Sequence, residues 1–161
     1  MNELLNKISS YNIFNYLLPG TLFAILAGRV INRPLVQADI IVGLFLYYFF
    51  GLVISRFGSL IVEPILKGLK FVTFADYKDF VAASQKDAKL DVLSEVNNTY
   101  RTLVSMFLLL LLLKGYVRLE DKFPCLKPWN FTILAGLLLV MFLFSYKKQT
   151  SYITKRIHAD R

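Results

Sequence analysis

The sequence predicts an all-α protein that crosses the lipid bilayer four times. Apolar residues make up 56% of its 161 residues, above the roughly 45–50% of soluble domains. Charged residues are 19% of the chain, yet none occurs at 13–28, 40–55, 102–113 or 131–146. Because a bilayer core needs about 20 mostly apolar residues in a helix, each stretch marks the centre of one membrane span.

We expect one membrane domain over residues 1–161, since a chain of this length has room for a single domain. A helical segment at 64–100 should connect the second and third spans on the cytoplasmic side, and a basic tail should follow the last span at 147–161. The four spans are expected at about 13–31, 40–57, 102–119 and 129–146.

Two features should modify the first two helices. Pro19-Gly20, near the start of the first span, predicts a break because proline removes an amide donor from the helix. Residues 3–18 would then form a separate helix at the membrane surface. The second apolar run continues to Leu66. A helix from Ile40 to Leu66 would be roughly 40 Å long, longer than a hydrocarbon core of about 30 Å, so its end should project into water.

Basic residues are divided unevenly between the two sides of the bilayer. With four spans, the N-terminus, residues 56–101 and the C-terminal tail lie on one side, which holds 13 of the 19 lysines and arginines. The positive-inside rule places the side with more Lys and Arg in the cytoplasm. We therefore expect both termini in the cytoplasm.

The sequence contains none of three motifs for enzyme chemistry: a phosphate-binding G-x-x-x-x-G-K-[ST] loop, a G-x-S-x-G nucleophile elbow or an H-E-x-x-H zinc pair. It has one histidine, His158, and one cysteine, Cys125. These are too few for an imidazole-rich metal site or an internal disulfide. We expect no enzymatic activity, no cofactor and no metal.

Small side chains form a stripe along the second span. Gly51, Ser55 and Ser59 recur every four residues, and Gly43 lies eight residues before Gly51. Small residues at this spacing let helix backbones approach closely, which favours helix association in lipid. The stripe predicts packing between subunits of a homo-oligomer, or packing among the four spans of one chain.

Charged and amide side chains near the cytoplasmic ends of the second and third spans form a candidate polar clamp. Arg56 and Glu63 are seven residues apart, two helical turns, and so should share one face. Glu95, Asn98 and Arg101 recur every three residues along the helix that enters the third span. The two sets could join through ion pairs, within a chain or between chains, or could be solvated surface residues.

The C-terminal tail is short and basic. Lys147, Lys148, Lys155 and Arg156 lie within ten residues of one another. Beside a membrane, such residues bind anionic headgroups with about 1 kcal/mol each. In an oligomer, several tails could instead form a basic ring that holds a nucleotide or an oligonucleotide. We expect no specific binding of duplex DNA.

Three segments of the chain resemble small multi-pass membrane effectors of bacterial anti-phage defence systems. They are Ser10–Gly20 (SYNIFNYLLPG), Arg56–Pro64 (RFGSLIVEP) and Asn97–Arg101 (NNTYR), less than a fifth of the chain. The similar proteins are the Hailong-type transmembrane effector and the membrane accessories of RNA-targeting CRISPR systems. The resemblance implies a homo-oligomeric pore in the bacterial inner membrane that depolarises an infected cell under control of a cytoplasmic nucleotidyltransferase or other sensor. It assigns a role to no individual residue.

The leading hypothesis is therefore a pore or channel effector gated from the cytoplasm by a nucleotide, an oligonucleotide or a partner protein. No span has the polar face that a wide aqueous pore requires, so the pore would be narrow or gated by dewetting of hydrophobic residues. The alternative is a non-conducting membrane anchor that recruits a soluble partner through its cytoplasmic segment and tail. A transporter is less favoured because the middle of every span lacks charge.

The distribution of basic residues predicts the result of a labelling experiment. Cysteines introduced at Lys86 and Thr150 should be shielded from membrane-impermeant thiol reagents in intact cells, because both positions lie on the side with more basic residues. Cys125, in the turn between the third and fourth spans, should be labelled. Labelling of Thr150→Cys in a Cys125→Ser background would overturn the orientation.

Overall fold

The predicted all-α architecture with four helices able to span a membrane is confirmed in the computed structural model, which describes residues 13–159. Every regular element within this range is a helix. Each of the long apolar helices contains one of the four stretches without charge. These helices are Ile13–Val30, Ile40–Gly68, Lys89–Lys122 and Pro124–His158.

The first two long helices each contain one π-helical turn, in which hydrogen bonds join residues five apart instead of four. In both helices the turn ends two residues before a proline, Pro19 or Pro64. The elements of these two helices are η1 (Ile13–Leu17), α2 (Leu18–Val30), α3 (Ile40–Phe57), η2 (Gly58–Val62) and α4 (Glu63–Gly68).

The predicted break at Pro19-Gly20 is wrong, because η1 runs into α2 without interruption. A proline ring clashes with the carbonyl group four residues before it in a regular α-helix. The wider π-helical turn gives the ring room and lets the helix continue. The rest of the expected interfacial helix, residues 3–12, lies outside the described residues.

The second half of the chain contains a short helix and the two longest helices. At 1.5 Å per residue the two longest extend roughly 50 and 45 Å. The last one continues as helix beyond residue 146, so the described part of the expected tail is helical. The elements are α5 (Tyr77–Ser84), α6 (Lys89–Lys122), the 3-10 turn η3 (Pro124–Trp129) and α7 (Asn130–Ala159).

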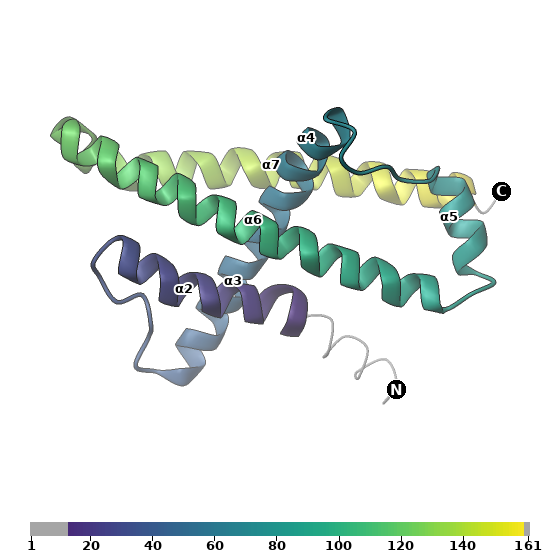
Figure 1. The fold of residues 1–161 in the computed structure, drawn as a ribbon, viewed down its shortest axis with the longest axis horizontal. Helices are drawn as coiled ribbons and strands as arrows, with labels where there is room; N and C mark the ends of the chain where they lie inside the picture. Colours follow the sequence, from purple (N-terminus) through teal and green to yellow (C-terminus); the bar gives the residue numbers. More distant parts are fainter. Residues whose placement is uncertain (1–12, 160–161) are drawn as a thin grey trace.

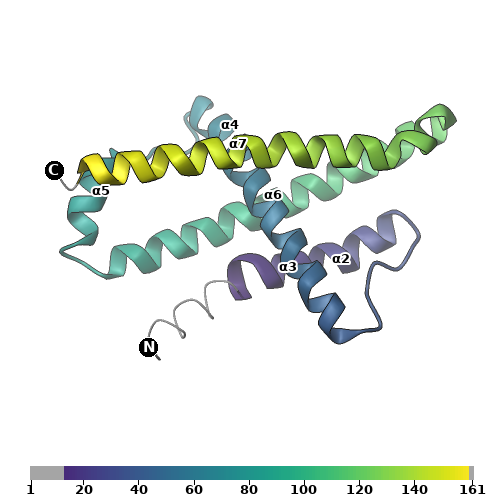
Figure 2. The same ribbon diagram turned by 180° about the vertical axis from the view of Figure 1, so that it is seen from behind.

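The continuous helix formed by α3, η2 and α4 passes obliquely between α6 and α7. In Figure 1 it lies behind α6, and in Figure 2 it lies behind α7. The turn η3 lies at one end of the molecule, whereas α5 and the C-terminus lie at the other (Figure 1). We call this second end the basic end; it corresponds to the side that the sequence predicts to be cytoplasmic.

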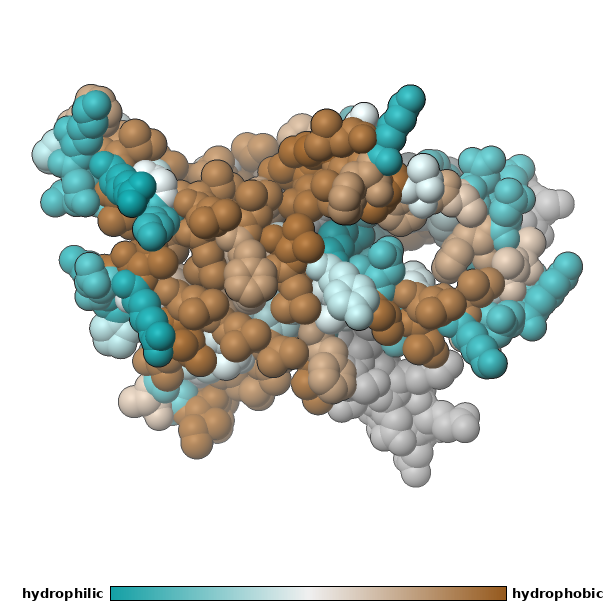
Figure 3. All heavy atoms as spheres, viewed as in Figure 1, coloured by the Kyte–Doolittle hydropathy of each residue, from teal (hydrophilic) through white to brown (hydrophobic). Residues whose placement is uncertain are grey.

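The face of the molecule in Figure 3 is mostly apolar between hydrophilic residues that gather at its two ends. Little of this apolar surface is covered by the chain itself. In the most apolar part of the last helix, 6% of the residues are buried, against 28% in the first helix. The helix α7 therefore has few packing partners within the chain.

Two glycines allow the first two helices to pack closely. A Cβ atom at Gly20 would overlap the carbonyl group of Tyr47, and one at Gly51 would overlap the carbonyl group of Tyr16. The rings of Tyr16 and Tyr48 meet edge to face, with centroids 5.4 Å apart. Contact between backbones at this distance requires residues without a side chain, so both glycines are needed for this crossing.

Gly51→Ala should destabilise the protein by about 3 kcal/mol, the upper part of the usual range for overpacking. The new methyl group would meet backbone atoms, which cannot rotate away. Gly136→Ala in α7 is the control, because nothing lies within 4 Å of an added Cβ there and alanine favours a helix. Thermal unfolding in detergent should show a lower midpoint only for Gly51→Ala. Equal midpoints for the two variants would contradict the crossing.

Candidate functional site

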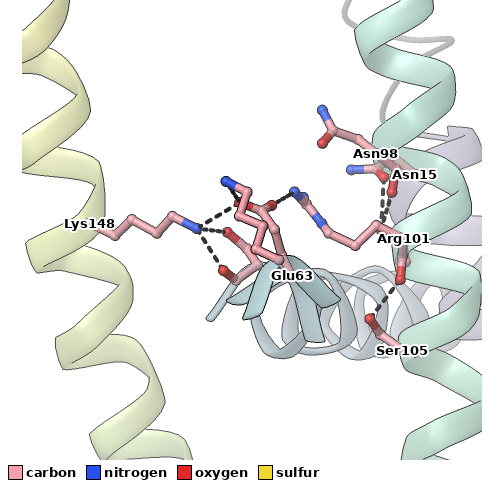
Figure 4. Close-up of polar contacts among 9 residues, drawn as sticks. Asn15, Glu63, Asn98, Arg101, Ser105 and Lys148 are labelled. Carbon is pink, nitrogen blue, oxygen red and sulfur yellow. Dashed lines mark hydrogen bonds and ion pairs between the residues drawn. The ribbon is translucent and has the colours of Figure 1, made fainter. Parts of the chain in front are cut away.

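Glu63, the first residue of α4, contacts three cations on three helices. Its carboxylate accepts hydrogen bonds from Arg101 Nη1 at 2.6 Å and from Lys67 Nζ at 3.2 Å, and Lys148 Nζ lies 3.8 Å away. The cations belong to α6, α4 and α7 (Figure 4). The Glu63 side chain is only 10% exposed, so these partners replace the water that the carboxylate has lost. We call these four residues the Glu63 cluster.

Lys148 also attaches α7 to the backbone of η2. Its ammonium group donates to the carbonyl oxygen of Ser59 at 2.6 Å and to the Ser59 hydroxyl at 2.8 Å. The amide of Glu63 donates to Gly58, five residues back. The next bond in this series would run from residue 64 to Ser59, but Pro64 has no amide hydrogen. Proline thus leaves the Ser59 carbonyl without a main-chain donor, and Lys148 supplies one.

Buried polar side chains continue from the Glu63 cluster into the apolar part of the molecule. The hydroxyl of Thr102 lies 3.0 Å from Asn15 Oδ1 and 2.8 Å from the Asn98 carbonyl oxygen. A hydroxyl has one hydrogen, so Thr102 donates to one of these oxygens at a time. Hydrogen bonds between membrane helices each stabilise helix association by roughly 0.6–2 kcal/mol. We call the buried set the polar seam: Asn15, Ser55, Thr102 and Ser105.

The structure brings together Glu63 and Arg101, two of the five residues of the predicted clamp. Asn98, one turn before Arg101, contacts the polar seam. Arg56 and Glu95 form no ion pair with any residue between 13 and 159. The π-helical turn explains the position of Arg56, because it rotates Glu63 by roughly 100° relative to a regular α-helix. The predicted shared face of Arg56 and Glu63 is therefore absent.

The small-residue stripe is covered within the chain itself. Gly51 packs against η1, Gly43 lies against the ring of Tyr47, and Ser59 binds Lys148. All four positions of the stripe are buried within the chain, which favours the alternative of packing within one chain: Gly43, Gly51, Ser55 and Ser59. Packing between chains through these positions stays a prediction.

Of the four basic residues predicted to contact lipid or ligand, only Lys148 joins the cluster. Lys147, Lys155 and Arg156 are exposed on the surface of α7, and their contact with a lipid or ligand stays a prediction. Sequence reasoning missed Lys67 and the connection between Lys148 and η2. It also missed Asn15, although an amide between Phe14 and Tyr16 in an apolar run is a signal of a buried polar contact.

A scan against protein-family models, a search of the curated proteins and a search of the solved structures find no match to this chain. Between residues 13 and 159, no group of three His, Cys, Asp or Glu side chains is placed to hold a metal ion.

Replacing Glu63 by glutamine should destabilise the protein by roughly 3 kcal/mol, because it leaves partly buried cations without their carboxylate. Glu95→Gln is the matched control, since the Glu95 carboxylate forms no ion pair within the described chain. Denaturant unfolding in detergent measures both variants. Equal stability of the two variants would show that the cluster does not hold the helices together.

Proposed function

We propose that this protein is an ion channel effector that assembles from several copies and depolarises the inner membrane when it is released from the basic end. The observation that supports this function is the network of one buried carboxylate and three partly exposed cations between membrane helices. Buried charges that face other helices are typical of ion pathways and switches in membrane proteins.

In this proposal the Glu63 cluster holds the closed state. It links α4 to α6 through Arg101 and to α7 through Lys148. Because α7 buries so little of its apolar surface, loss of the Lys148 contacts would free it to move. That movement would open the polar seam to water and ions. The resulting path would be narrow, as expected from spans that lack a wide polar face.

The π-helical turn η2 provides the second arrangement that a gate needs. If η2 became regular α-helix, Glu63 would rotate by roughly 100°, and the helix would have to kink at Pro64 to relieve the clash of its ring. The carboxylate would leave Arg101 and Lys148 and return to the face of Arg56, as the sequence spacing predicts. One helix with two discrete hydrogen-bonding registers is a two-state element of the kind that can couple a signal to a pore.

The signal would arrive at the basic end as a nucleotide, an oligonucleotide or a partner protein such as a nucleotidyltransferase. The resemblance to anti-phage effectors supports this class of signal. Exposed cations on the outer surface of α7 support an anionic ligand, because Lys147, Lys155 and Arg156 all face solvent there.

A non-conducting anchor remains the second candidate, and one observation favours it. The connection between α4 and α5 exposes Leu69 and Phe71 by 71% and 78%. Exposed apolar side chains next to one another mark surfaces that bind other proteins or lipid. A soluble partner recruited by this connection would need no pore.

Charge reversal at Arg101 separates the two functions. Arg101→Glu should open the channel, because it repels Glu63 and releases α6 from α4. Cells that express it should lose membrane potential, and liposomes that contain it should leak ions. The double variant Glu63→Arg/Arg101→Glu should recover part of the wild-type behaviour. Arg118→Glu, exposed on the same helix away from the cluster, is the control. Liposomes with Arg101→Glu that are as tight as this control would leave the anchor as the function.

A further inference from the structure

The Glu63 cluster carries more positive than negative charge. Three cations, Lys67, Arg101 and Lys148, lie within 4 Å of a single carboxylate, so the formal charge of the cluster is +2. These cations form no ion pair with another carboxylate between residues 13 and 159. Like charges held close together at a low-dielectric boundary repel one another. An anion bound between them would remove this repulsion.

Two of the cations also have N–H groups that could donate hydrogen bonds to an anion. Arg101 gives one Nη to Glu63, and its Nε is buried without a hydrogen-bond partner in the described chain. A buried donor without an acceptor is unfavourable, and an oxyanion beside the guanidinium would supply one. The Lys67 side chain is 44% exposed, and Glu63 is its one hydrogen-bond acceptor among residues 13–159. A guanidinium and an ammonium group side by side match the oxygens of a phosphate.

The cluster has an apolar border. Lys67 lies over the ring of Phe74, 4.1 Å from its centroid, and this aromatic side chain is 49% exposed. A ligand with a charged head and apolar chains would match both parts of this surface.

We infer that the Glu63 cluster binds the phosphate group of an anionic phospholipid, with an acyl chain against the exposed ring of Phe74. Basic pockets between membrane helices bind such headgroups. The phosphate would bridge α4, α6 and α7, while Glu63 keeps Lys67, Arg101 and Lys148 in position. The site would bind lipid whether or not the assembled protein conducts. Evidence against the channel would therefore not be evidence against the lipid site.

The test uses full-length protein in nanodiscs that contain phosphatidylglycerol and phosphatidylcholine, followed by native mass spectrometry. Wild-type protein should retain phosphatidylglycerol in preference to phosphatidylcholine. Lys67→Gln and Lys148→Gln should each bind phosphatidylglycerol about fivefold more weakly, the effect of one lysine at a membrane surface. Lys78→Gln removes the same charge from an exposed position of α5, outside the cluster and the basic tail, and should leave retention unchanged.

Lys67→Gln is the decisive variant, because Lys67 is half-exposed and holds no other helix, whereas Lys148→Gln also releases α7. Circular dichroism confirms that each variant is folded. Equal retention of phosphatidylglycerol by Lys67→Gln and Lys78→Gln would overturn the site. If excess inorganic phosphate displaces the lipid at the same site and raises the unfolding temperature equally, a soluble phosphate and not a lipid is the ligand, and the lipid assignment is wrong.

Discussion

The Glu63 carboxylate makes the arrangement of the helices depend on charge. Within lipid, apolar surfaces give helices no reason to prefer each other over acyl chains, so small residues and polar contacts decide which helices meet. Close glycine contacts hold the first two helices together. The last helix has few such contacts and is attached through Lys148 to Glu63 and Ser59. A change of charge near Glu63 should therefore weaken the attachment of α7 before it affects the first two helices.

The two prolines determine where that charge lies. Pro19 and Pro64 each follow a π-helical turn, so the same local chemistry recurs in two helices. In the second helix it has two consequences at once. The wider turn rotates Glu63 towards α6 and α7, and the missing amide of Pro64 leaves the Ser59 carbonyl free for Lys148. A π-helical turn and a side chain inserted into the main-chain ladder are both known departures from a regular helix. The prolines that would break a regular helix thus create the site.

The sequence predicted the fold class and the four apolar helices because long uncharged runs leave few alternatives. It also predicted that Glu63 and Arg101 belong to one polar group, since both lie near the cytoplasmic ends of spans that a single segment connects. It could not place Arg56, because seven residues correspond to one face only in a regular α-helix. Contacts between distant segments, such as Asn15 with Thr102 or Lys148 with Ser59, depend on how helices cross. Spacing along one helix carries no information about that crossing.

The composition of the interior favours a channel over an anchor on energetic grounds. An anchor needs only apolar spans, and replacing a buried ion pair by well-packed apolar residues is often neutral or stabilising. This protein instead buries Glu63 and a set of hydroxyl and amide side chains between its helices. Such groups are unfavourable in a membrane unless each finds a partner. A chain whose helices meet through polar groups has an interior that water and ions can enter once the helices separate. In the channel that we propose, that property would serve conduction, whereas an anchor would use the same groups only to pack its helices.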